Sequence, residues 1–194
     1  MNNYPEYADV NGRKYKINTD FRVAIKCDEI AKNGKIGNLE RGLAVLYLLY
    51  GDEALNNFED QEKLLKVALK FLSCGKEIEN NNEEPDMDYI EDMDYIEASF
   101  MSDYHIDLEN EEMHWWKFNN LMSGLSNSEF GDCCVLNRIR NLRTFDTRQI
   151  KDVKERHKIE KAKKEVQLKR NKKINQITKE QEESMERLNK LLGL

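Results

Sequence analysis

A hexapeptide rich in carboxylates occurs twice in succession. Residues 86–91 read Asp-Met-Asp-Tyr-Ile-Glu, and residues 92–97 repeat the same six. Such carboxylates suggest calcium, but an EF-hand loop needs glycine at its sixth position, which Glu91 occupies here. A glycosidase-like carboxylate pair is a further alternative, although nothing else in the chain builds a sugar site. We therefore expect Asp86 or Asp88 to cap a helix, with the acidic side chains near its positive end. The residues expected to pack inward are Tyr89, Met93 and Ile96.

Cysteine and histidine are the other residue types with chemical potential. The four cysteines are Cys27, Cys74, Cys133 and Cys134. The adjacent pair suits neither a common disulfide nor a tetrahedral metal site. A zinc site that uses His105 or His114 remains an alternative to buried free thiols in a reducing compartment. His114 has no nucleophile or carboxylate partner in a recognisable motif, which favours a structural role. We expect no catalytic residue, no metal, no cofactor and no enzymatic activity.

Both tryptophans of the chain lie next to each other in the segment 113–118, Met-His-Trp-Trp-Lys-Phe. Adjacent side chains on a helix point about 100° apart, so the two rings cannot face one groove of the core. We expect one ring to anchor the core and the other to lie at an interface, where tryptophan often dominates binding. Burial of both rings is the open alternative. The candidate partner-binding residues are Trp115, Trp116 and Phe118.

Charge is divided unevenly along the chain. Residues 148–194 carry 15 basic and 8 acidic side chains, a net charge of +7, whereas residues 1–147 carry −13. We expect this basic arm, with Lys161 and Lys164 as candidate contacts, to meet its own body, a second copy or an acidic partner. Clustered Lys and Arg also allow nucleic-acid binding. The segment 148–173 has no aromatic residue to stack on bases, so we do not favour that alternative.

Local patterns predict the elements that position these residues. Asn11-Gly12 between two short alternating runs predicts a β-hairpin over 7–17, because both residues tolerate positive φ. Helices are expected over about 20–32, 38–50 and 60–72, with Thr19 or Asp20, Asn38 and Asp60 at their starts and glycines at their ends. The second of these is apolar on most sides, which predicts a central position.

The second half of the chain is expected to be helical as well. A polar loop over 76–85 precedes helices over about 87–104, 109–123 and 129–142. A long solvated helix or partly disordered arm follows from Arg148, and a short helix from Thr178. The expected fold is mainly α, with an N-terminal β-hairpin and helical body (1–147) and a basic helical arm (148–194). No run of about 18 apolar residues and no signal-peptide pattern occurs, so we expect a soluble cytoplasmic protein without membrane contact.

Several segments, taken in order, resemble one known family. They are residues 4–7 (Tyr-Pro-Glu-Tyr), 14–22, 71–76 (Phe-Leu-Ser-Cys-Gly-Lys), 92–100, 104–108, 114–118 (His-Trp-Trp-Lys-Phe) and 137–140. In this arrangement the chain resembles the bacteriophage gene product fifteen family, small proteins of long-tailed phages and prophages of Gram-positive bacteria. The resemblance runs from the predicted hairpin to the basic arm.

The resemblance implies a role in building the phage tail. Genes of the family typically lie between those for the major tail protein and the tape-measure protein, where tail assembly chaperones are encoded. The implied function is therefore a chaperone that binds the tape-measure protein in the host cytoplasm until tail-tube protein replaces it. Self-association is a further possible interaction. One alternative is a structural tail or virion component, and another is a nucleic-acid-binding phage protein that uses the basic arm.

Overall fold

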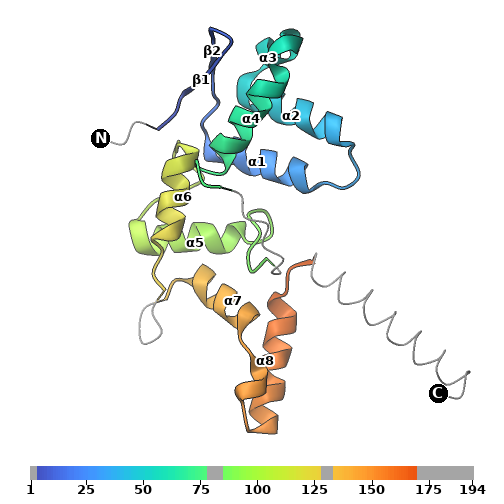
Figure 1. Cartoon of the computed structure of the whole chain (residues 1–194). Coiled ribbons are helices and arrows are strands. Elements are labelled where there is room, and N and C mark those ends of the chain that lie inside the picture. The colour runs from blue at the N-terminus through green and yellow to red at the C-terminus, as the bar shows by residue number, and fades with distance from the viewer. Residues whose placement is uncertain (1–3, 78–84, 128–132, 170–194) are drawn as a thin grey trace, which may run out of the picture. The chain divides into compact units, whose positions relative to one another are not determined.

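The chain folds mainly into helices, with one β-hairpin near its N-terminus (Figure 1). The structure, a computed structural model, describes residues 4–77, 85–127 and 133–169. The predicted helix start near Glu129, the middle of the polar loop and the helix from Thr178 lie outside these residues. Two compact units are present, one formed by residues 1–81 and 99–126 and the other by 82–98 and 127–194. The boundary predicted at residue 147 marks a change of charge along the chain and stays a prediction.

The first unit begins with the predicted hairpin. Strands β1 (Tyr7–Val10) and β2 (Arg13–Lys16) pair antiparallel, with Val10 opposite Arg13. The turn residues Asn11 and Gly12 have φ values of 51° and 80°, as the Asn-Gly dipeptide predicts. The hairpin is fastened to the rest of the unit by Asp60, a fully buried carboxylate that accepts a 2.5 Å hydrogen bond from the Tyr15 hydroxyl.

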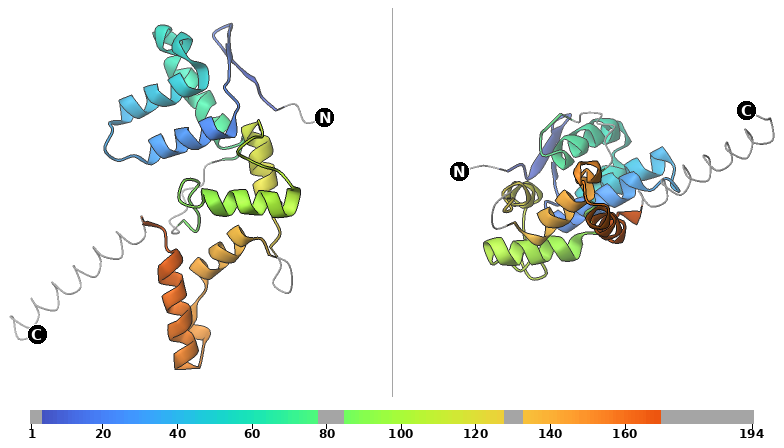
Figure 2. Two further views of the ribbon diagram at one scale, coloured as in Figure 1. Left: turned by 180° about the vertical axis from the view of Figure 1, so that it is seen from behind. Right: turned by 90° about the horizontal axis from the view of Figure 1, so that it is seen from below.

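Four of the helices in this unit follow the hairpin. They are α1 (Phe21–Lys32), α2 (Asn38–Tyr50), α3 (Asp52–Asn56) and α4 (Gln61–Leu72). The Asp20 side chain caps α1 by accepting the Arg22 N–H at 2.8 Å, and α2 ends at Gly51, both as predicted. Helices α1 and α2 lie side by side (Figures 1 and 2). Helix α4 begins directly after Asp60, as predicted, but the Asp60 side chain makes no capping hydrogen bond because its carboxylate is used by the hairpin.

Stacked aromatic rings form the centre of this unit. The ring of Phe118 on α6 (Trp115–Ser123) lies 4.6 Å from that of Phe21 and 5.2 Å from that of Phe100, both nearly parallel to it. The Trp115 ring lies 5.8 Å from the Phe118 ring. All four side chains are buried, so this aromatic stack joins α6 to α1 and to the second half of α5 (Met93–Tyr104).

In the second unit, an arginine joins three segments. The second unit contains α7 (Val135–Thr144), α8 (Val153–Val166) and the start of α5. The Arg143 guanidinium donates two 2.7 Å hydrogen bonds to the Asp92 carboxylate and one of 2.7 Å to the Val166 carbonyl oxygen. Asp92 is therefore held outside the helix, and α5 begins at Met93 instead of near residue 87 as predicted. The Asp88 side chain closes a turn there, accepting the N–H groups of residues 90 and 91.

The basic arm is helical over its first part. Helix α8 packs on α7 and ends at Val166, because Gln167 is extended with φ −64° and ψ 135°. Leu168 is 2% exposed, so the described part of the arm includes a buried side chain after α8 ends. The prediction of a long solvated helix or a partly disordered arm extends beyond the described residues and stays a prediction. Among the helices of the described ranges, none is both long and apolar enough to span a membrane.

Candidate functional site

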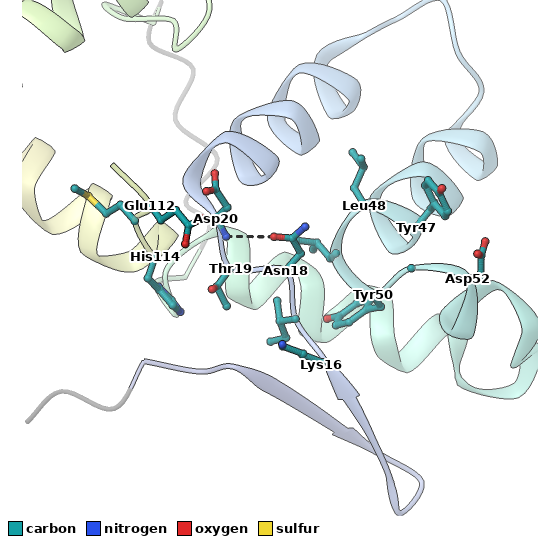
Figure 3. A pocket seen from close by; sticks show the side chains of 14 residues that line it. Lys16, Asn18, Thr19, Asp20, Tyr47, Leu48, Tyr50, Asp52, Glu112 and His114 are labelled. Atoms are coloured by element: carbon teal, nitrogen blue, oxygen red, sulfur yellow. Dashed lines mark hydrogen bonds between the residues drawn. The ribbon is translucent and has the colours of Figure 1, made fainter. Parts of the chain in front are cut away.

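A polar cleft of about 960 Å³ opens in the first unit (Figure 3). Residues 16–20, residues 47–52 at the end of α2, and residues 112–114 form its walls. Backbone hydrogen bonds join these walls, from Asn18 N to Leu49 O at 2.7 Å and from Phe21 N to Met113 O at 3.0 Å. The cleft is thus built from three segments that are far apart in sequence but fixed to one another.

Charged side chains of both signs surround this cleft. Figure 3 shows Lys16, Asp20, Asp52 and Glu112 among the lining side chains. Asp20 is engaged, since it caps α1 and its second oxygen lies 3.0 Å from Arg22 Nη1. This arrangement suits polar contacts with a bound chain or ligand.

His114 lies at the edge of the cleft with both ring nitrogens in use. Its Nδ1 accepts the Trp116 N–H at 3.0 Å and so caps α6, which leaves the proton on Nε2, 3.1 Å from the Pro5 carbonyl oxygen. The ring also stacks on Tyr4, with 4.9 Å between ring centres. These contacts place His114 in the structural role that the sequence favoured, as the link between the N-terminal segment and α6.

Both tryptophans bind the C-terminal end of α4. Trp115 is 4% exposed, and its Nε1–H donates to the Leu72 carbonyl oxygen at 2.9 Å. Trp116 is half-buried, and its Nε1–H donates to the Phe71 carbonyl oxygen at 2.8 Å. The last carbonyls of a helix have no partner within it, so the Trp115 indole supplies a donor to Leu72, and the Trp116 indole adds a second donor to the Phe71 carbonyl, which also accepts the Cys74 N–H at 3.0 Å. The adjacent positions of the two tryptophans in the sequence did not indicate that both would bind the end of α4.

The predicted partner-binding residues fall into two groups. Trp115, Trp116 and Phe118 lie together on α6, where Phe118 is fully buried and only Trp116 keeps a partly exposed ring. Lys161 and Lys164 belong to the second unit and are exposed on α8. The partner-binding role of all five stays a prediction.

An exposed apolar stripe along α2 was missed by the sequence analysis. Leu39, Leu43 and Tyr47 follow each other at intervals of four residues, so they share one side of the helix. Leu39 is 76% exposed and Tyr47 is 51% exposed, whereas Leu46 and Leu49 are buried. Helix α2 packs on α1, α3 and α4, so it is central in the first unit as predicted. Its apolar surface nevertheless includes one side that is in contact with solvent.

Burial disfavours ionisation of two of the thiols. Burial raises the pKa of the Cys27 thiol to about 12 and also raises the pKa of Cys74. All four cysteines are free. In the described part of the chain, no three His, Cys, Asp or Glu side chains gather in a way that could hold a metal ion.

Comparison with known proteins identifies a family. The family described as bacteriophage Gp15 protein matches residues 2–168, a range that includes the cleft, both tryptophans and α8. No match was found among curated proteins or solved structures. The family match confirms the resemblance that the sequence segments carried. The chain is a phage protein that belongs to the bacteriophage Gp15 family.

Proposed function

We propose that this phage protein is a tail assembly chaperone that binds the tape-measure protein in the host cytoplasm during tail morphogenesis, without catalysis. The family match supports the phage setting, and the role that the resemblance implies supports the tail. The observation that carries protein binding is the apolar stripe of Leu39, Leu43 and Tyr47.

The stripe has the form that recognition of a helix requires. Apolar side chains at intervals of four residues present a row about two turns long, onto which an amphipathic helix can lay its own apolar side. Fully burying an exposed leucine contributes about 1.5–3 kcal/mol. The polar cleft adjoins the row, because Tyr47 belongs to both.

Co-expression with the tape-measure protein tests this proposal. We expect the wild-type chain to keep the client soluble and to co-elute with it at a defined mass in size-exclusion chromatography with light scattering. The double variant Leu39→Asp, Tyr47→Asp should bind the client ~100-fold more weakly or worse, because two apolar contacts are replaced by buried charges. The client should then precipitate.

A matched control uses two apolar side chains outside the stripe. Met101 and Val153 are 47% and 58% exposed, so Met101→Asp, Val153→Asp makes the same chemical change at similar exposure. This control should retain the client, and circular dichroism should show unchanged helix content in both variants. Client solubility that is insensitive to the stripe substitutions, or a wild-type chain that elutes alone, would reject the proposal.

A structural component of the tail is the competing assignment within the phage. The composition of mature particles separates the two, because a chaperone leaves before the particle is complete. If purified particles contain a fixed number of copies of this chain, the protein is a structural component and the chaperone proposal is rejected.

A further inference from the structure

Arg22 holds an acidic loop in a fixed shape. The loop covers residues 107–112 and carries Asp107, Glu109, Glu111 and Glu112. From α1, Arg22 Nη2 donates to the carbonyl oxygens of Leu108, Glu109 and Glu111 at 2.5, 3.1 and 3.1 Å. Because the guanidinium gathers the carbonyls on one side, the loop keeps one backbone conformation before α6 begins. This is also why α6 begins at Trp115 and not near Glu109 as predicted.

The acidic side chains of this loop are exposed. Asp107 is used locally, since it accepts the Glu109 N–H at 3.0 Å and the Asn110 side-chain N–H at 2.9 Å. Glu109, Glu111 and Glu112 are exposed, and no lysine or arginine in the described ranges forms an ion pair with them. The acidic loop therefore presents clustered carboxylates on a backbone that Arg22 holds by hydrogen bonds.

Helix α8 presents the opposite charge. Lys154, Lys158 and Lys161 are spaced four and three residues apart, so they form a basic stripe on one side of the helix, and Lys164 continues it one turn further. All four are exposed, and none forms an ion pair with a described residue. Like charges at this spacing destabilise a helix by about 0.2–0.5 kcal/mol per pair, a cost that an acidic partner removes.

We infer that the acidic loop of one copy docks on the basic stripe of α8 in a second copy. One chain carries both surfaces, their charges are opposite in sign, and each surface has four charged side chains, so the two are electrostatically complementary. The two surfaces are different patches, so the contact is head-to-tail. Such contacts form rings or filaments, depending on the rotation between copies. The inference requires no client and stands apart from the proposed function.

The test uses the full chain alone, by sedimentation velocity over a range of protein concentrations. At an ionic strength of about 0.1 M the Debye length is about 10 Å, and at about 1 M it is about 3 Å, so association should be present at the lower salt and lost at the higher. Lys154→Glu, Lys158→Glu, Lys161→Glu and, separately, Glu109→Lys, Glu111→Lys, Glu112→Lys should each weaken self-association ~100-fold or more, because like charges then oppose each other.

Mixing the two charge-reversed variants is the decisive step. Each lacks one surface of the wild-type pair, but together they restore one complementary interface, so the mixture should associate where neither variant does alone. The control Lys35→Glu, Lys70→Glu, Lys76→Glu makes the same change of net charge on exposed lysines outside the stripe. It should associate within ~3-fold of the wild-type chain, because long-range charge alone contributes little at this salt.

Several outcomes would overturn the inference. They are a wild-type chain that is monomeric at the lower salt, a control as damaged as the stripe variant, and a mixture that fails to associate. Submicromolar, steeply salt-dependent DNA binding by a monomeric wild-type chain, lost in the stripe variant, would assign the stripe to nucleic acid instead. If a charge-reversed variant loses helix content, the corresponding Lys→Gln or Glu→Gln triple variant replaces it, and its weaker association is then the expected result.

Discussion

Asp60 is a buried carboxylate whose partners all come from the hairpin. It accepts hydrogen bonds from Asn11 Nδ2 at 2.6 Å, Tyr15 Oη at 2.5 Å and Arg13 Nη1 at 3.1 Å. The Tyr15 hydroxyl, together with Asn11 and Arg13, lowers the pKa of Asp60 below its usual value near 3.8, because these donors favour the ionised form. A single charged residue thus holds the hairpin against the start of α4.

The lowered pKa of Asp60 predicts a specific loss of stability in acid. Below pH 4 the unfolded chain binds a proton at this carboxylate while the folded chain does not, so the contribution of Asp60 is present above pH 4 and disappears as pH falls through the folded pKa. Asp60→Asn should therefore lower the free energy of unfolding at pH 7 and flatten its decline in acid. Denaturant titrations between pH 2 and 7 measure both. The control is Asp94→Asn, at an exposed position of α5, which should leave the decline of the unfolding free energy in acid as it is in the wild-type chain. If Asp60→Asn shows the same decline as the wild-type chain, the prediction is contradicted.

The C-terminal end of α4 requires a glycine, Gly75, and a substitution can test this requirement. Gly75 follows α4 with φ +75°, and a Cβ there would lie 3.3 Å from Cη2 of Trp116. Its N–H closes the helix end on the Lys70 carbonyl oxygen at 2.8 Å. The same helix end receives both indole N–H groups, so the turn and the tryptophans form one unit of structure.

Gly75→Ala should lower the free energy of unfolding by about 1–2 kcal/mol, because an L-residue is strained at positive φ. The added methyl group also presses on the Trp116 ring, so a shift in tryptophan fluorescence should accompany the loss. Gly34→Ala is the matched control, since a Cβ at that glycine meets nothing within 4 Å and the backbone is not in the positive φ region. Urea titration measures the free energy of unfolding of both variants. If Gly75→Ala loses no more stability than Gly34→Ala, the end of α4 tolerates a side chain and the prediction is contradicted.

Elements with a local signal were predicted from the sequence, and those set by distant partners were not. The hairpin turn at Asn11-Gly12 and helices α1 and α2 carry their own turn and cap residues. The starts of α5 and α6 were placed too early because Asp92 is held by Arg143 and residues 108–111 are held by Arg22. The candidate site shows the same division. The tryptophans could be singled out by residue type, but the polar cleft requires three distant segments.

At the scale of the whole molecule, each of the two units is formed by two separate stretches of the chain. The second unit combines residues 82–98 with residues 127–194, and no sequence pattern relates these two segments. A buried ion pair connects the two segments, since the Arg143 side chain is 10% exposed and that of Asp92 is 1% exposed. Arg143 also donates to the Asp86 carbonyl oxygen at 2.9 Å, so one guanidinium joins the start of this unit, α7 and the end of α8.

Replacing Arg143 should therefore loosen the second unit and spare the first. Arg143→Met leaves the Asp92 carboxylate buried without a countercharge, which costs about 3–5 kcal/mol. Hydrogen exchange of the full chain, read by mass spectrometry, should show ~100-fold or greater loss of protection in residues 86–92, α7 and α8, and little change in α1, α2 and α4.

The control for this substitution is Arg140→Met on the same helix. Arg140 pairs with Asp86 at 3.0 Å, but both side chains are about a third exposed (35% and 34%), so the loss should stay below about 1 kcal/mol. Exchange that accelerates equally in α1, α2 and α4 of Arg143→Met would mean that the two units unfold as one. Selective acceleration would show that the Asp92–Arg143 pair stabilises the second unit alone, so the basic stripe of α8 could be released while the apolar stripe of α2 stays folded.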